Sequence, residues 1–136
     1  MDRTAARELI ERFLAAFNRG DHDEMLSCLS EDVVHDINEN GREIGKDKFR
    51  WFLATRRRHY REEVSDIVVM VAEDGNRAAA EFTLRGTYLA TAEGLPEANG
   101  QSYSLSGGAF FEIDDGLISR TSSYYSLAGW ISQISD

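Results

Sequence analysis

A histidine and an aspartate stand next to each other in the segment "VVHDINENG", residues 33–41. Two valines begin the segment as a strand, and either of the next two side chains could accept a proton from a substrate. Because side chains alternate along a strand, only one of His35 and Asp36 can enter a cavity on one face. The segment ends in residues typical of turns: Asn38, Glu39, Asn40 and Gly41.

We expect Asp36 to point inward, with Asn38 two residues further on as its polar companion. Desolvation among aromatic side chains would raise the pKa of Asp36 toward neutrality and make it a usable general base. The alternative for Asp36 is an ordinary exposed carboxylate at a strand end. His35 is the second candidate for the base, and its alternative is a half-buried packing or hydrogen-bonding residue.

Tyrosines of the later strands could donate hydrogen bonds to a substrate oxygen: Tyr88, Tyr103, Tyr124 and Tyr125. Tyr88 follows Phe82 and Leu84 on an apolar face, and this spacing predicts that its phenol enters the cavity. The alternative for each tyrosine is a ring that fills the core with its hydroxyl at the rim.

The composition limits the classes of protein that the chain can belong to. With 136 residues, 42% of them hydrophobic, we expect one domain, residues 1–136. The formal charge of −9 opposes binding to nucleic acid or to an anionic membrane. The single cysteine, Cys28, lies in an apolar run that predicts a buried thiol. The N-terminal residues lack the apolar core of a signal peptide, so we expect a cytoplasmic protein.

Motifs for metals and cofactors are weak. "GREIGKD" is one residue too short between its glycines for a phosphate loop, and His22, His35 and His59 lack ligand spacing. We therefore expect neither a metal nor a cofactor. The run "TRRRHYREE" predicts a solvated helix end in which Arg56, Arg57 and Arg58 lie near the negative end of the helix dipole. An acidic group of a ligand that meets these arginines is the alternative.

Hydrophobic periodicity predicts helices first and strands afterwards. Apolar residues at three- and four-residue spacings predict a helix over 4–19 that ends at Gly20, a second from Asp21, and a third after Gly45. Two pairs of strands follow, joined across 73–76 and 114–116, and a short apolar helix lies around 127–134. This order predicts an α+β fold, with a strongly curved, mainly antiparallel sheet wrapped around the N-terminal helix as a cone.

Two stretches carry a resemblance to a known superfamily. "FNRGDHDEMLSCLSEDVVHD" and "AEFTLRGTYLATAEGLPEANGQSYSLSGGAFFEIDDGLISRTSSYY" resemble nuclear-transport-factor-2-like proteins, in particular SnoaL-like and ketosteroid isomerase-related proteins. The resemblance covers essentially the whole chain. It implies the cone fold and a cavity for a small apolar molecule, with Phe13, Phe17, Phe52, Phe82 and the tyrosines as its walls.

Most catalytic groups of these relatives have no chemically equivalent residue in this chain. The tyrosine that donates to the oxyanion in ketosteroid isomerase corresponds to Phe13, and the protonated aspartate corresponds to Ala109. The general base falls on Asp36 or Ile37, depending on a shift of one residue. The acid on the last strand of the polyketide cyclases corresponds to Ser123.

Two functions of different classes remain from the sequence. The first is a cofactor-independent enzyme that carries out isomerisation, cyclisation or hydration by proton transfer on a hydrophobic, carbonyl-bearing molecule, such as a steroid- or polyketide-like one. In it Asp36 or His35 takes the proton, and Tyr88 or Tyr124 donates to the enolate oxygen. The second is a binding or dimerisation domain of the same fold without turnover. On either reading we expect a homodimer through the sheet face that carries Ser102, Ser104 and Glu112.

Overall fold

The computed structural model describes residues 1–39 and 41–135, so Asn40, one of the predicted turn residues, lies outside the described residues. The helices are α1 (Arg3–Arg19), α2 (His22–Ser27), α3 (Lys46–His59) and α4 (Leu127–Ile134). The strands are β1 (Leu29–Asp36), β2 (Arg42–Ile44), β3 (Tyr60–Val71), β4 (Arg77–Tyr88), β5 (Ser102–Asp114) and β6 (Leu117–Tyr125). The sequence pattern did not predict β2, since a strand of 3 residues is too short to show a period.

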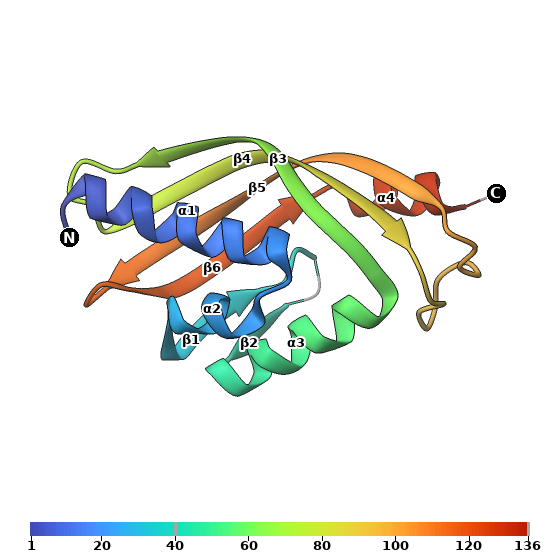
Figure 1. Ribbon diagram of the computed structural model, residues 1–136, viewed down its shortest axis with the longest axis horizontal. Helices are drawn as coiled ribbons and strands as arrows, with labels where there is room; N and C mark the ends of the chain where they lie inside the picture. The colour runs from blue at the N-terminus through green and yellow to red at the C-terminus, as the bar shows by residue number, and fades with distance from the viewer. Residues whose placement is uncertain (40, 136) are drawn as a thin grey trace.

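The first two helices begin and end where the sequence predicts. Asp2 caps α1 by accepting a hydrogen bond from the Ala5 amide at 2.9 Å, and Gly20 ends it with a φ of 70°. Asp21 then caps α2 through the Glu24 amide at 3.1 Å. The sharp turn at Gly20 places α2 and the start of β1 beneath α1 (Figure 1).

The six strands form one sheet in the order β2-β1-β6-β5-β4-β3. Every neighbouring pair is antiparallel except β1 and β6, which run parallel. Figure 1 shows the long strands β3 to β6 crossing the molecule, with α1 lying along β3. The parallel pairing joins the start of the chain to its end, and it places His35 opposite Thr121 and Asp36 opposite Ser122.

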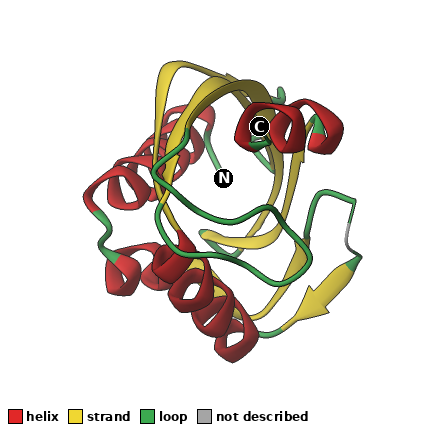
Figure 2. Ribbon diagram, turned by 90° about the vertical axis from the view of Figure 1, so that its right-hand side faces the viewer, coloured by secondary structure: helices red, strands yellow, loops and turns green. Residues whose placement is uncertain are grey.

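The sheet curls around the inside of the molecule, as the view in Figure 2 shows. The apolar side of α1 faces the concave side of the sheet and buries Leu9, Ile10, Phe13 and Leu14. The predicted α+β cone, with a curved, mainly antiparallel sheet around the N-terminal helix, is confirmed. Cys28 is fully buried, and burial raises the pKa of its thiol. None of the described helices is long and apolar enough to cross a membrane.

Candidate active site

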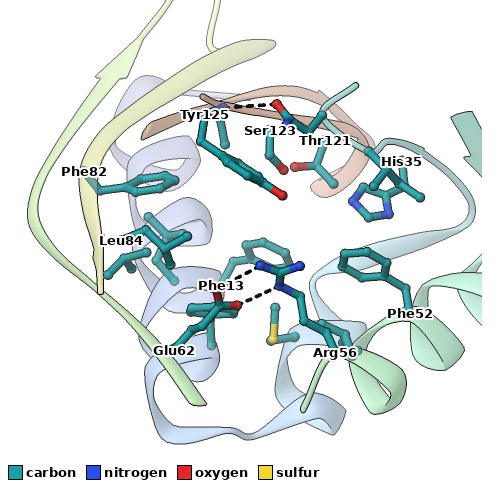
Figure 3. Close-up of a pocket in the computed structure, with 18 of the residues that line it drawn as sticks. Phe13, His35, Phe52, Arg56, Glu62, Phe82, Leu84, Thr121, Ser123 and Tyr125 are labelled. Atoms are coloured by element: carbon teal, nitrogen blue, oxygen red, sulfur yellow. Dashed lines mark hydrogen bonds and ion pairs between the residues drawn. The ribbon is translucent and has the colours of Figure 1, made fainter. Parts of the chain in front are cut away.

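A cavity of about 200 Å³ lies between the concave face of the sheet, α1 and α3 (Figure 3). Most of its wall is aromatic and aliphatic, and α1, α3, β4 and β5 supply that part. The apolar lining includes Phe13, Phe17, Phe49, Phe52, Phe82, Leu84 and Phe111. Among the described residues, the polar side chains of the lining come from the end of β1 and the turn after it, from β6, and from the junction of α3 with β3. The expected lining by Phe13, Phe17, Phe52 and Phe82 is what the structure has.

His35 is the ionisable group that β1 turns into this cavity. Its side chain is only 5% exposed, and its ring packs against Phe49 and Phe52 with ring centroids 4.7 and 4.6 Å away. The Nδ1 atom is buried and has no hydrogen-bond partner among the described residues. A buried polar atom without a partner costs stability, so its retention favours a role toward a ligand.

Burial lowers the pKa of His35 from 6.5 to about 4, and the neighbouring Asp36 charge opposes this only in part. The imidazole is therefore neutral at physiological pH. The unfolded chain takes up a proton near pH 6.5, whereas the folded chain does so only near pH 4. Between these values the unfolded state binds more protons, so stability falls as the pH falls.

We expect this histidine to remove about 3 kcal/mol of stability between pH 7.5 and pH 4. Urea unfolding at several pH values measures the effect. In His35→Phe the decline over that range should be smaller by the same amount. An unchanged decline in the variant would show that His35 is not the buried neutral group described above.

Polar groups beside His35 come from the turn after β1 and from β6. Asn38 adopts a φ of 36°, and its Oδ1 accepts a hydrogen bond from the Tyr125 amide at 3.1 Å. This bond orients the side chain and leaves Nδ2 buried without a partner among the described residues. Thr121, Ser123 and Tyr125 follow in alternate positions of β6, and all three line the cavity. The Tyr125 hydroxyl points into the cavity in Figure 3.

An ion pair forms the opposite polar wall. Nε and Nη2 of Arg56 donate to the two oxygens of Glu62 at 2.7 and 2.9 Å. Tyr103 also donates to Glu62, at 2.6 Å, and its own pKa is raised by burial and by the Glu62 charge. The Glu62 side chain is 4% exposed and that of Arg56 is 23% exposed. The Arg56 Nη1 atom makes no hydrogen bond to a described residue. The prediction of a solvated Arg56 is therefore wrong, because Glu62 holds it against the cavity.

A glycine allows Tyr103 to reach Glu62. Glu62, Gly86 and Tyr103 are paired side by side on β3, β4 and β5. A Cβ atom at position 86 would lie 2.3 Å from the Tyr103 hydroxyl, so any larger residue would displace the ring. The missing side chain at Gly86 therefore lets the tyrosine lie across β4 and donate to the carboxylate.

Asp36 does not point into the cavity, so the expectation for its orientation is wrong. It lies on the outer face of the sheet, where Arg42 donates to it at 2.6 and 3.2 Å and Ser122 at 2.6 Å. These hydrogen bonds lower its pKa, opposite to the expected rise. Strand alternation explains the result: the pairing of β1 with β6 turns His35 and Ile37 inward and Asp36 outward.

Replacing Asp36 with asparagine should leave substrate turnover within about twofold of the parent protein, because its carboxylate lies outside the cavity wall. The loss of its ion pair with Arg42 should cost roughly 1 kcal/mol of stability or less. Parallel assays of activity and of urea unfolding test this expectation. A large loss of activity in a folded variant would contradict the outward placement.

The tyrosines that were expected in the cavity also divide into those that line it and those that do not. Tyr88 is fully buried outside the cavity wall, since its hydroxyl donates to the Pro96 carbonyl at 2.6 Å and accepts from the Ala92 amide at 2.9 Å. The expectation that its phenol enters the cavity is wrong, because it holds the loop after β4. Tyr103 reaches Glu62 rather than the cavity wall. Tyr124 contributes to the lining, but its ring packs on Phe110 and is 54% exposed.

Of the positions that the resemblance pairs with catalytic groups, four lie on the cavity wall: Phe13, Ile37, Ala109 and Ser123. None of these four side chains is an acid or a base. Asp36, the alternative to Ile37 as the general base, is not on that wall. Within residues 1–39 and 41–135, no three His, Cys, Asp or Glu side chains are grouped as a metal site would require. The chemistry that this site can perform therefore depends on His35 and the hydroxyl and amide groups beside it.

Comparison with known proteins identifies the family. The model of the SnoaL-like domain matches residues 10–121, and the chain belongs to this family, within the nuclear-transport-factor-2-like superfamily. No match was found among the curated proteins.

Solved structures of high similarity exist. A candidate polyketide cyclase from Pseudomonas putida KT2440 is 52% identical over 99% of both chains, with a TM-score of 0.94. A second, from Xanthomonas campestris pv. campestris, is 49% identical over 99% of this chain and 100% of its own, with a TM-score of 0.97. A third, from Silicibacter sp. TM1040, is 50% identical over 100% of this chain and 99% of its own, with a TM-score of 0.96.

Proposed function

We propose that this protein is a cofactor-independent enzyme that moves a proton next to the carbonyl group of a small hydrophobic molecule. The observation that carries the proposal is the buried, neutral imidazole of His35, whose Nδ1 has no partner among the described residues. Neutral imidazole can accept a proton, and the aromatic wall keeps competing water away from it.

In the proposed reaction, His35 accepts a proton from the carbon next to the carbonyl. The electrons of the broken C–H bond form the enolate double bond, and the carbonyl electrons move onto its oxygen. The hydroxyl of Tyr125, which points into the cavity, can donate a hydrogen bond to that oxygen. The imidazolium then lies beside an enolate, and attraction between the two charges in this apolar site offsets the low pKa of the free histidine. In a substrate with a C=C bond next to the deprotonated carbon, return of the proton to the far end of the dienolate gives isomerisation. Attack by the enolate carbon on a second carbonyl forms a C–C bond and an alkoxide, which takes the proton back from the imidazolium, and this gives cyclisation.

The size of the cavity limits the substrate. A cavity of roughly 150 Å³ in another protein holds benzene, so about 200 Å³ suits one ring or a small fused pair. A longer, polyketide-like molecule would place one ring inside and extend through the open side. The similarity of about half of the residues to candidate polyketide cyclases supports a substrate of this class.

Binding without turnover is the second candidate, and one observation favours it. Among the described residues that line the cavity, the only carboxylate is Glu62, and Arg56 and Tyr103 already occupy it. Such a cavity lacks the unpaired acid that the family's enzymes use.

Exchange of carbon-bound protons in deuterated water separates the two candidates. We would incubate the protein with 2-tetralone, a two-ring ketone, and follow its α-proton signals by NMR. An enzyme of the proposed kind accelerates their loss over buffer, whereas a binding protein shifts the signals without accelerating it. Absence of acceleration across a panel of one- and two-ring ketones that do bind would contradict the enzymatic proposal.

The outer sheet face also supports the expected homodimer. Large apolar side chains are exposed on it: Val68 (52%), Met70 (50%), Phe110 (51%) and Tyr124 (54%). An aromatic and aliphatic surface of this kind is typical of a protein interface. Light scattering of the purified chain should give twice the monomer mass, and a monomeric mass at high concentration would contradict this expectation.

A further inference from the structure

A second cavity, of about 340 Å³, lies on the other side of the Arg56–Glu62 pair. It is bounded by the ends of α1 and α3 and by the start of β3, which come together near the turn at Gly20 (Figure 1). The two cavities adjoin, because both are lined by Phe17, Phe52, Leu53 and the ion pair. A molecule in the first cavity can therefore extend past these side chains into the second.

The charge of the second cavity is opposite to that of the protein. Its lining includes Arg19, Arg56, Arg57 and Arg61. Among the described residues that line it, the only carboxylate is Glu62, which Arg56 already neutralises. The chain as a whole has a formal charge of −9. Concentration of arginine at one hollow of an acidic protein would attract a small anion there and leave the rest of the surface repulsive.

Two of these arginines have no acidic partner in the part of the chain that the structure describes. Arg57 donates from Nη1 to the Gly20 carbonyl at 2.7 Å, and Arg61 makes no side-chain hydrogen bond; neither forms an ion pair with a described residue. Arg19 pairs with Asp21 at 3.4 Å, but both side chains are about half exposed. His22 also lines this cavity, and its pKa is lowered by burial and by the charge of Arg57.

We infer that the second cavity binds an anionic group, a carboxylate or a phosphate, of the same molecule whose hydrophobic, carbonyl-bearing part occupies the first cavity. Guanidinium groups fit both anions because they offer parallel N–H donors. This inference rests on the proposed function for the identity of the first cavity, and it adds that the substrate is acidic.

Two histidines report on the two cavities separately. His22 lies in the arginine-lined cavity and His35 in the apolar one. We would titrate the protein with 4-phenylbutyrate and with the neutral 4-phenylbutanamide, following both ring signals by NMR. The amide should shift only His35, whereas the carboxylate should shift both rings, raise the pKa of His22 and bind about tenfold more tightly at low salt.

Matched variants locate the charge that is responsible. In Arg57→Gln/Arg61→Gln the preference for the carboxylate should disappear, while Arg58→Gln, on the same helix but outside both cavities, should retain it. Because Arg57 also bonds to Gly20, the single variant Arg61→Gln tests the inference without that contact and should lose part of the preference. Competition by inorganic phosphate at His22 would identify phosphate as a ligand class, and its absence would restrict the class to carboxylates.

Equal affinity of the amide and the carboxylate would overturn the inference, as would an undiminished preference in the double variant. These outcomes are separate from a failure of the proposed function. The 2-tetralone exchange uses a neutral ketone and does not need the second cavity. A protein that fails to exchange 2-tetralone can still be tested for the carboxylate preference. A protein without that preference can still be tested for exchange.

Discussion

Replacing His35 with phenylalanine should lower the rate of α-proton exchange by about 10²- to 10⁴-fold, the usual contribution of a general base. The phenylalanine ring keeps the packing against Phe49 and Phe52 and removes both ring nitrogens. Because it also removes a buried nitrogen without a partner, the variant should be as stable as the parent or more stable. A gain in stability together with a loss of turnover is typical of a residue retained for function.

The measurement is the initial exchange rate of 2-tetralone, with urea unfolding of the same preparation as the check on folding. His59→Ala is the matched control. His59 lies at the end of α3, and its Nδ1 contacts the Ala90 carbonyl at 2.9 Å, outside the cavity wall. Exchange in a folded His35→Phe protein at the rate of the parent would exclude His35 as the base.

Replacing Arg56 with methionine should destabilise the protein by about 3–5 kcal/mol near neutral pH, the cost of leaving one member of a buried ion pair alone. Methionine keeps most of the side-chain volume but withdraws two hydrogen bonds from Glu62, whose side chain is 4% exposed. Tyr103 alone then faces a buried charge. The free energy of unfolding in urea measures the loss.

Arg58→Met provides the matched control, since Arg58 is exposed on the same helix and should change stability by less than about 0.5 kcal/mol. Equal stability of the two variants would show that the Arg56–Glu62 pair is not the desolvated contact that its geometry indicates.

Local sequence patterns predicted most of the fold. The period of α1, its end at Gly20, the cap at Asp21, and the turns that follow β3 and β5 depend on neighbours a few residues away, and all of these signals are visible in the chain. The parallel pairing of β1 with β6 joins residues more than 80 positions apart, and no local pattern specifies such a partner.

The same long-range contact decides which of His35 and Asp36 faces the cavity. Alternation shows that only one can do so, but the choice depends on which face of β1 meets the core, and β6 sets that. The apolar residues Val33 and Ile37 share the phase of His35, and this was the available signal. The resemblance to ketosteroid isomerase, whose general base falls on Asp36 or Ile37, favours the opposite phase.

Arg56 shows a second limit of sequence analysis. It stands three and four residues after Leu53 and Phe52, so it lies on the apolar side of α3 despite its charge. That spacing could have identified it as a buried ion. Its partner Glu62 could not be identified, because the contact between the two side chains depends on the sharp bend between α3 and β3.

The central claim is that a neutral imidazole faces an apolar cavity, and NMR titration of the His35 ring tests it most directly. At about pH 5.5 a histidine of ordinary pKa is mostly charged. The account predicts that His35 is still neutral there, since burial lowers its pKa to about 4. A ring that is already protonated at that pH would contradict the burial, the proposed base and the chemistry built on it.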